Sequence, residues 1–165
     1  FYVVRRGYFL KGRVMKLVIK TVIIALSMSF FGGCTIATPV VSSGKYEGLA
    51  NDDPAMSKIY VYREQAFTGG ANQYDVMVNS VLSGSLPNGS FFETDVEPGD
   101  TKVEPRTLTS FGFGKGVFSM TEPGGLYCFK LTLNFCLQCK SADINSVDTK
   151  QCEKEIQNLK KVELK

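Results

Sequence analysis

Short apolar segments separated by turn-forming residues dominate the chain between residues 58 and 104. β-branched and aromatic residues, which favour strands, fill Lys58–Arg63, and apolar residues alternate with other residues along Tyr74–Val78. Further strands are predicted over residues 81–86, 91–96 and 101–104, with turns at 79–80, 87–90 and 97–100. Strands this short, joined by tight turns, predict a mainly β chain: a small antiparallel β-sandwich of immunoglobulin-like or transthyretin-like kind.

The strongest late strand is predicted over Leu126–Cys136, where side chains alternate between two faces. The apolar face comprises Tyr127, Phe129, Leu131, Leu133 and Phe135, and the other face comprises Cys128, Lys130, Thr132, Asn134 and Cys136. One apolar face on so long a strand predicts that it packs against the core of the sandwich.

A short C-terminal helix is expected after a polar loop. Asp148 and Gln151 have the spacing of a capping box, and Cys152, Ile156 and Leu159 recur at helical spacing. We therefore expect a helix over residues 149–160, with Lys160 and Lys161 as its solvated end. The predicted sandwich domain with its helix spans residues 58–165.

Residues 15–33 have the features of an export signal: Lys16 and Lys20 near the start, an apolar run, and small residues at the end. The apolar run is far shorter than the roughly 20 residues of a membrane-spanning helix. We interpret residues 1–14 as a misassigned upstream extension, because Met15 begins a complete signal; the alternative is a twin-arginine motif at Arg5-Arg6.

Gly32-Gly33-Cys34 closes the apolar run and resembles the lipobox of bacterial lipoproteins. The resemblance implies cleavage between Gly33 and Cys34 and acylation of the Cys34 thiol, which would anchor the chain in membrane lipid. Thr35, rather than Asp, follows the cysteine, which favours the outer membrane, with the periplasmic side preferred. Residues 34–57 contain few large apolar residues and are predicted to form a flexible tether.

The charge balance changes when the leader is removed. Six of the 19 basic residues precede Cys34 and no acidic residue does, which leaves 13 basic against 16 acidic residues. A net negative body gives no reason to expect nucleic acid as a partner. The chain contains no His, so a Ser-His-Asp or Cys-His catalytic site is excluded, and we expect no bound cofactor or metal.

Apart from Cys34, the chain carries an even number of cysteines: Cys128, Cys136, Cys139 and Cys152. In an oxidising compartment this favours two disulfides. On one straight strand Cys128 and Cys136 would lie about 26 Å apart, too far to pair. Two connectivities remain: Cys128–Cys152 with Cys136–Cys139, or Cys128–Cys139 with Cys136–Cys152. We prefer the second slightly, because a bridge from the sheet to the helix closes the larger loop.

Three other patterns have both a structural and a chemical interpretation. The glycines at 112, 114 and 116 lack the spacing of a phosphate-binding loop, so we expect a hairpin or mobile loop. Aromatic residues around them are expected at the edge of the core, with a partner surface as the alternative: Phe111, Phe113 and Phe118. Three carboxylates share a strand face and are expected to be solvated: Glu93, Asp95 and Glu97.

Several of the predicted strands together resemble one family of bacterial lipoproteins, grouped as domain of unknown function 2846. That family typically combines a lipobox with an (I/V)YVYR strand, a V-x-V-N-G hairpin, a G-S-(Y/F)-F strand and a V-x-P-G turn. The segments that carry the resemblance are Ile59–Arg63, Val76–Leu86, Ser90–Phe92, Val96–Gly99 and Gly124–Tyr127. The family's motifs imply a small β-sandwich on a lipid anchor, and they supply no catalytic residues.

The sequence therefore predicts a membrane-anchored envelope lipoprotein, non-enzymatic, which binds another envelope protein or the cell wall. The alternative is an envelope enzyme, either a thiol-redox protein using Cys136 and Cys139 or a carboxylate-dependent enzyme using the face of Glu93.

Overall fold

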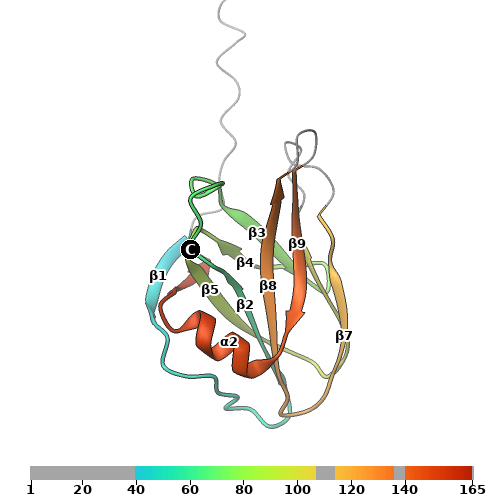
Figure 1. Ribbon diagram of the computed structural model, residues 1–165. Coiled ribbons are helices and arrows are strands. Elements are labelled where there is room, and N and C mark those ends of the chain that lie inside the picture. Colours follow the sequence, from blue (N-terminus) through green and yellow to red (C-terminus); the bar gives the residue numbers. More distant parts are fainter. Residues whose placement is uncertain (1–39, 107–113, 136–139, 165) are drawn as a thin grey trace, which may run out of the picture. The chain divides into compact units, whose positions relative to one another are not determined.

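The computed structural model of the chain describes residues 40–106, 114–135 and 140–164 (Figure 1). The strands are β1 (Val40–Lys45), β2 (Ser57–Arg63), β3 (Tyr74–Val78), β4 (Val81–Leu86), β5 (Ser90–Val96), β6 (Gly99–Pro105), β7 (Val117–Thr121), β8 (Leu126–Phe135), β9 (Lys140–Val147) and β10 (Lys160–Leu164). The helix is α2 (Thr149–Ile156). The described strands form a six-stranded sheet in the order β1-β10-β5-β2-β8-β9 and a four-stranded sheet in the order β4-β3-β6-β7.

The two sheets pack face to face around one core, which confirms the predicted β-sandwich. The predicted inward face of β3 is correct, since Tyr74, Val76 and Val78 are buried, and so is that of β8, where Phe129 and Leu131 are buried. The remaining buried residues of this core are Ile59, Val61, Leu86, Phe92, Val96, Val103, Ala142, Ile144 and Val162. Alternation along each strand thus places one apolar face of each sheet between the layers.

The β3–β4 hairpin turns through Asn79 and Ser80, as the sequence predicts. Both residues have positive φ angles, 49° and 68°, as a two-residue hairpin turn with the right-handed twist of its strands requires. Asn79 also accepts a bond at its side-chain oxygen from Lys102 N at 2.9 Å, which ties the turn to β6. The turn of the hairpin therefore lies between Val78, the last residue of β3, and Val81, the first residue of β4.

The pairing is not wholly antiparallel. β2 pairs with β8 in parallel and β5 pairs with β10 in parallel, whereas the other strand pairs are antiparallel. The parallel β2 is central in its sheet and is buried on both faces, apart from the half-buried Lys58. A strand buried on both faces needs a cover on its outer side.

That cover is α2, which lies over the outer face of the six-stranded sheet (Figure 1). A second apolar cluster fills the space beneath the helix: Tyr60, Tyr62, Phe91, Cys128, Cys152, Ile156 and Leu159. The Asp148 side chain accepts bonds from Lys150 N and Gln151 N, both at 3.1 Å, so the predicted N-cap is correct. The helix ends four residues earlier than predicted, because the chain turns at 157–159 and enters β10.

Residues 40–57 correct the predicted tether. They belong to the sandwich: β1 pairs with β10, with Val40 opposite Leu164, and Tyr46 and Leu49 pack on the cluster beneath α2. Lys160 and Lys161 are likewise strand residues and not the end of a helix. β10 also contacts β4, so the β1–β10 pair covers one edge of the sandwich. Residues 34–39 lie outside the described residues.

The predicted polar loop before the helix is also wrong for residues 140–147, which form β9. Ala142 and Ile144 alternate inward from it, and Ile144 N donates to Lys115 O at 2.8 Å. Within the described residues, no helix has the length and apolarity that a membrane crossing would need.

Candidate functional site

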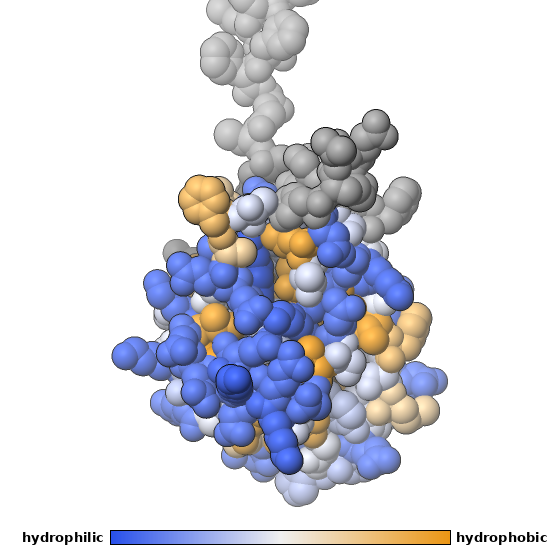
Figure 2. All heavy atoms as spheres, in the orientation of Figure 1, coloured by the Kyte–Doolittle hydropathy of each residue, from blue (hydrophilic) through white to orange (hydrophobic). Residues whose placement is uncertain are grey.

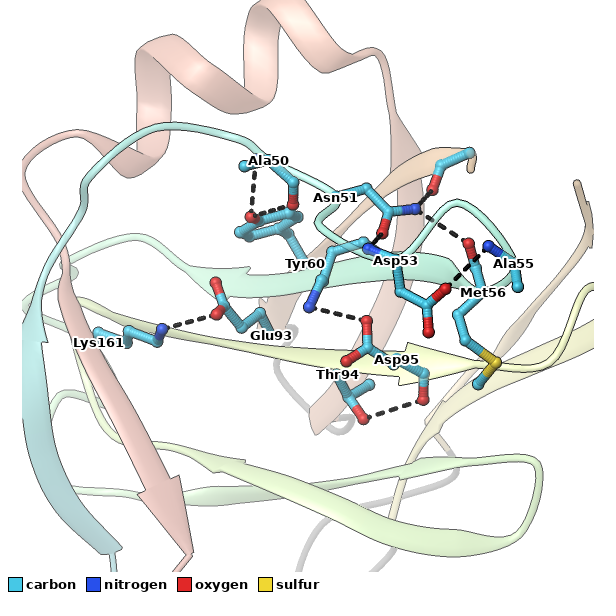
Figure 3. A network of polar contacts seen from close by, with 12 residues as sticks. Ala50, Asn51, Asp53, Ala55, Met56, Tyr60, Glu93, Thr94, Asp95 and Lys161 are labelled. Carbon is cyan, nitrogen blue, oxygen red and sulfur yellow. Dashed lines mark hydrogen bonds and ion pairs between the residues drawn. The ribbon is translucent and has the colours of Figure 1, made fainter. Parts of the chain in front are cut away.

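A polar cleft of about 370 Å³ opens on the outer face of the six-stranded sheet, beside α2. One wall is the end of β1 and the chain that follows it, and the floor is formed by β2 and β5. Its lining comprises Ser43, Gly44, Lys45, Tyr46, Glu47, Gly48, Ala50, Asp52, Lys58, Tyr60, Phe91, Glu93 and Lys161. Figure 3 shows the polar contacts along this cleft.

The aromatic residues of the floor fix the wall in place. The Tyr60 hydroxyl accepts a bond from Ala50 N at 3.1 Å and donates one to Ala50 O at 3.0 Å (Figure 3). The Tyr46 ring packs edge-on against Phe91, with 6.1 Å between ring centroids. Burial raises the pKa of Tyr46 and of Tyr60, so both hydroxyls stay protonated at neutral pH.

Two ion pairs engage lysines of the cleft lining. The β2–β5 register places Lys58 opposite Asp95, which lies outside the lining, and Tyr60 opposite Glu93. Lys58 Nζ lies 2.7 Å from Asp95 Oδ1. Lys161 Nζ, from the neighbouring β10, lies 2.6 Å from Glu93 Oε1. Partial burial disfavours the charge on Lys58, but the contact with Asp95 outweighs it and the pKa of Lys58 is raised.

The wall is held at its far end by Asn51. Its side-chain amide donates to Met56 O at 3.0 Å and to Gly125 O at 3.3 Å, while its oxygen accepts from Asp53 N at 3.1 Å. Asp53 in turn accepts from Ala55 N at 2.9 Å. These bonds fix the chain from β1 to β2 against the start of β8, so the cleft has a defined shape.

The cleft carries balanced charge. Three lysines and three carboxylates line it, namely Lys45, Lys58, Lys161, Glu47, Asp52 and Glu93. Balanced charge with aromatic rings in the floor suits a polar ligand that is uncharged or zwitterionic. The wall is open at two glycines of the lining, since an added Cβ at Gly44 or Gly48 would meet no atom within 4 Å.

The acidic strand face predicted from the sequence is only partly present. Glu93 and Asp95 share the outer face of β5, but each is paired with a lysine. Glu97 follows the end of β5 and is exposed. Each of these two strand carboxylates is thus held in an ion pair, and within the described residues no three side chains of metal-ligating type come together.

The cysteines correct the preferred disulfide pattern. Cys128 is bonded to Cys152, with 6.1 Å between their Cα atoms, so the preferred Cys128–Cys139 and Cys136–Cys152 pairing is wrong. The physical reason is that Cys128 points to the outer face of β8, where α2 places Cys152 directly above it. Cys136 and Cys139 lie outside the described residues. The observed bridge belongs to the other connectivity left open by the sequence.

The glycine-rich segment has a packing role where it is described. A Cβ on Gly114 would overlap Pro105 and the carbonyl oxygen of Ala142, and one on Gly116 would lie 2.7 Å from Glu104 Cβ. The expected core edge is wrong for Phe118, which is 74% exposed on the outer face of β7 beside Lys102. Phe111, Phe113 and Gly112 lie outside the described residues.

Sequence reasoning missed a polar network between the helix and the sheet. Glu155 Oε2 accepts bonds from the Tyr62 hydroxyl at 2.8 Å and from Lys130 Nζ at 2.7 Å, and Lys130 also pairs with Glu64 at 2.6 Å. Gln151 Nε2 donates to Glu155 Oε1 at 2.7 Å. Partial burial opposes ionisation of Glu155, but these bonds outweigh it and lower the pKa of Glu155 to about 2.

The sequence contained one signal for the cleft and the network. β2 is apolar on both faces, which requires a cover on the outer side of its sheet. The cover comes from segments far away in the chain, α2 and the stretch after β1, so the residues brought together could not be read from spacing.

Comparison with known proteins identifies the family. The profile of a family described as "Protein of unknown function (DUF2846)" matches residues 53–142. The chain belongs to this family, which confirms the resemblance carried by the strands from Ile59 to Gly99. The match covers β2 to β8 and ends within β9, whereas α2, with Cys152, and β10, with Lys161, lie beyond it. No curated protein and no solved structure matches the chain.

Proposed function

We propose that this member of the DUF2846 family is a lipid-anchored envelope protein whose sandwich is a non-enzymatic binding module. The observation that carries the anchor is the leader that ends in Gly32-Gly33-Cys34, six residues before β1 begins. Acylated Cys34 would hold the sandwich at the membrane. The expected localisation is the periplasmic side of the outer membrane. The partner expected there is another envelope protein or the cell wall.

The disulfide supports export to an oxidising compartment. Cys128 and Cys152 are 2% and 0% exposed, and their bridge joins the sheet to its covering helix. Disulfides of this structural kind are rare in the reducing cytosol and common in the periplasm. The bridge and the leader therefore point to the same compartment by independent arguments.

The cleft beside α2 supports binding in preference to catalysis. The charged side chains at its floor are held in ion pairs, Glu93 with Lys161 and Lys58 with Asp95 outside the lining, and Tyr60 is hydrogen-bonded to the wall. General acid–base catalysis needs a group poised to exchange a proton. A charge-balanced recess fits instead a polar segment of a partner.

The anchor is tested by the mass of the mature N-terminus, measured on protein from the membrane fraction of the native host. The expected mass begins at Cys34 and includes acyl chains. Cys34→Ser should abolish the acyl mass, with Thr35→Ser as the matched control that keeps it. An unacylated N-terminus in the unmodified protein would reject the proposal.

The binding site is tested by placing a photo-crosslinking residue at Glu47, an exposed position on the cleft wall. The matched control carries the same residue at Asp100, exposed on β6 of the other sheet. Irradiation of intact cells should give a discrete adduct from position 47 only, and Glu93→Ala should weaken it. Monomer alone, or the same adducts from both positions, would count against the cleft.

A further inference from the structure

The loop between β2 and β3 carries the most exposed large apolar side chain among the described residues. Phe67 is 104% exposed, which means that no neighbour shields its ring. Residues 65–73 around it contain no charged side chain. Figure 2 shows that the surface over α2 and β1 is largely hydrophilic.

The loop is held rigidly although its tip is bare. Arg63 donates from Nη1 to Asn72 O at 2.6 Å and from Nη2 to Gly69 O at 2.8 Å. On the other side, Asn88 accepts from Ala66 N and donates to Ala66 O, both at 2.9 Å. These bonds fix the backbone on both sides of Phe67. Because the backbone that carries the ring is already fixed, the loop loses little conformational entropy when the ring binds an apolar environment.

The loop lies at the end of the sandwich where β1 begins (Figure 1). Val40 is six positions after Cys34, and a chain of six steps spans at most about 22 Å. A lipid on Cys34 would therefore keep this end of the sandwich within that distance of the bilayer. Val41, 42% exposed in β1, adds a second apolar side chain from the same strand start.

We infer that the loop over residues 65–73 contacts the lipid bilayer, with the Phe67 ring entering the membrane interface. The inference rests on the proposed acylation of Cys34 and goes beyond it, because a flexible anchor alone sets no orientation. The ring gains by leaving water, and the uncharged residues beside it reduce the cost of dehydrating the loop. Anchor and ring together would fix which face of the sandwich points away from the membrane.

The chain contains no tryptophan, so Phe67→Trp creates a single fluorescent reporter at the tip of the loop. The matched control is Phe118→Trp, which places the reporter on β7, where the native ring is 74% exposed. Both full-length proteins are purified from membranes, checked for acylation by mass spectrometry and reconstituted into phosphatidylcholine vesicles. Half of the vesicles carry bromine on the acyl chains as a quencher.

We expect the emission of the Phe67→Trp protein to shift to shorter wavelength in vesicles and to lose intensity in brominated lipid. The emission of the Phe118→Trp protein should keep its wavelength and intensity. Acylated protein in which both reporters behave alike would overturn the membrane contact and leave the anchor intact. Unacylated protein would overturn the proposed function, and the inference with it, since the short connection to Cys34 is what brings the loop to lipid.

Discussion

The guanidinium carbon of Arg63 lies 4.9 Å from the centroid of the Tyr74 ring. Arg63 ends β2 and Tyr74 begins β3, so this contact joins the two ends of the loop that carries Phe67. Arg63 is 2% exposed, and its charge is met by carbonyl oxygens and an aromatic face. Burial lowers the pKa of Arg63. A buried cation held by the carbonyls of a loop makes the shape of that loop part of the stability of the sandwich.

Replacing Arg63 should therefore destabilise the whole domain. Arg63→Met leaves the carbonyls of the half-buried Gly69 and Asn72 without these donors, at an expected cost of about 1 to 3 kcal/mol. Arg63→Lys should cost nearly as much, because one ammonium cannot reproduce the planar fork. Urea unfolding gives the free energies, and proteolysis within residues 64–73 should speed up. The exposed Lys154→Met is the control, and an equal effect there would contradict the argument.

Removing the disulfide should lower stability without changing the fold. The bridge spans a sequence separation of 24, for which loop-closure entropy gives about 3 kcal/mol. Cys128→Ala with Cys152→Ala should therefore lower the melting temperature, and reductant should lower that of the native protein to a similar degree. Non-reducing peptide mapping should recover peptides joined through Cys128 and Cys152. Recovery of Cys128 joined to Cys139 would refute this pairing.

Stability should fall in acid because of Glu155. The pKa of Glu155 is about 2 in the folded chain against an ordinary value of 4.5, so the carboxylate stabilises the fold at neutral pH. This contribution is complete above about pH 4.5 and is lost as the pH falls towards about 2. Because Glu155 is 19% exposed, we expect a loss on the order of 2 kcal/mol.

The matched variants isolate that carboxylate. Glu155→Gln should lower the unfolding free energy at pH 7 and flatten its dependence on pH between about 2 and 4.5. Glu64 contacts the same Lys130, but its side chain is 50% exposed. Glu64→Gln should therefore change the unfolding free energy by less than about 1 kcal/mol. Unchanged pH dependence in Glu155→Gln would show that other groups govern acid unfolding.

Gly84 provides a test of the core. A Cβ at this position would overlap the ring of Phe92, which is 2% exposed. Gly84→Ala should therefore cost about 1 to 3 kcal/mol through overpacking, measured by chemical unfolding. Ser83→Ala, on the neighbouring residue, should be close to neutral. Combining Gly84→Ala with Phe92→Leu should lower the unfolding free energy by less than the sum of the two single changes. Strict additivity would show that the added methyl group does not contact the Phe92 ring.

Apolar alternation predicted β3, and the turn signals at 79–80 and 87–90 predicted β4, both at their observed bounds. Apolar alternation also predicted β8 and its inward face. β1 could not be predicted, since five of its six residues are exposed and it is stabilised by pairing with β10. The stretch after the helix was misread because Leu159 keeps the helical spacing although the helix has already ended at Ile156.

The cleft could not be predicted for a related reason. Its lining residues come from β1 and the chain after it, β2, β5 and β10. No local pattern in the sequence indicates that Lys161 lies beside Glu93. The disulfide was open to better reasoning. Strand alternation turns Cys128 away from the core, and helical spacing puts Cys152 on the buried side of α2, so both cysteines face the same layer.

Within the described part of the chain, no strand pairs with the outer edge of β1, and its register with β10 is broken between Ser42 and Gly44. Regular exposed edges invite neighbouring molecules to add strands, and a bulge discourages this. Copies tethered to one leaflet would meet repeatedly in two dimensions, at local densities far above those of the same molecules in solution. The irregular edge of β1 would therefore hinder edge-to-edge strand pairing, and so aggregation, between copies anchored at high density in one membrane.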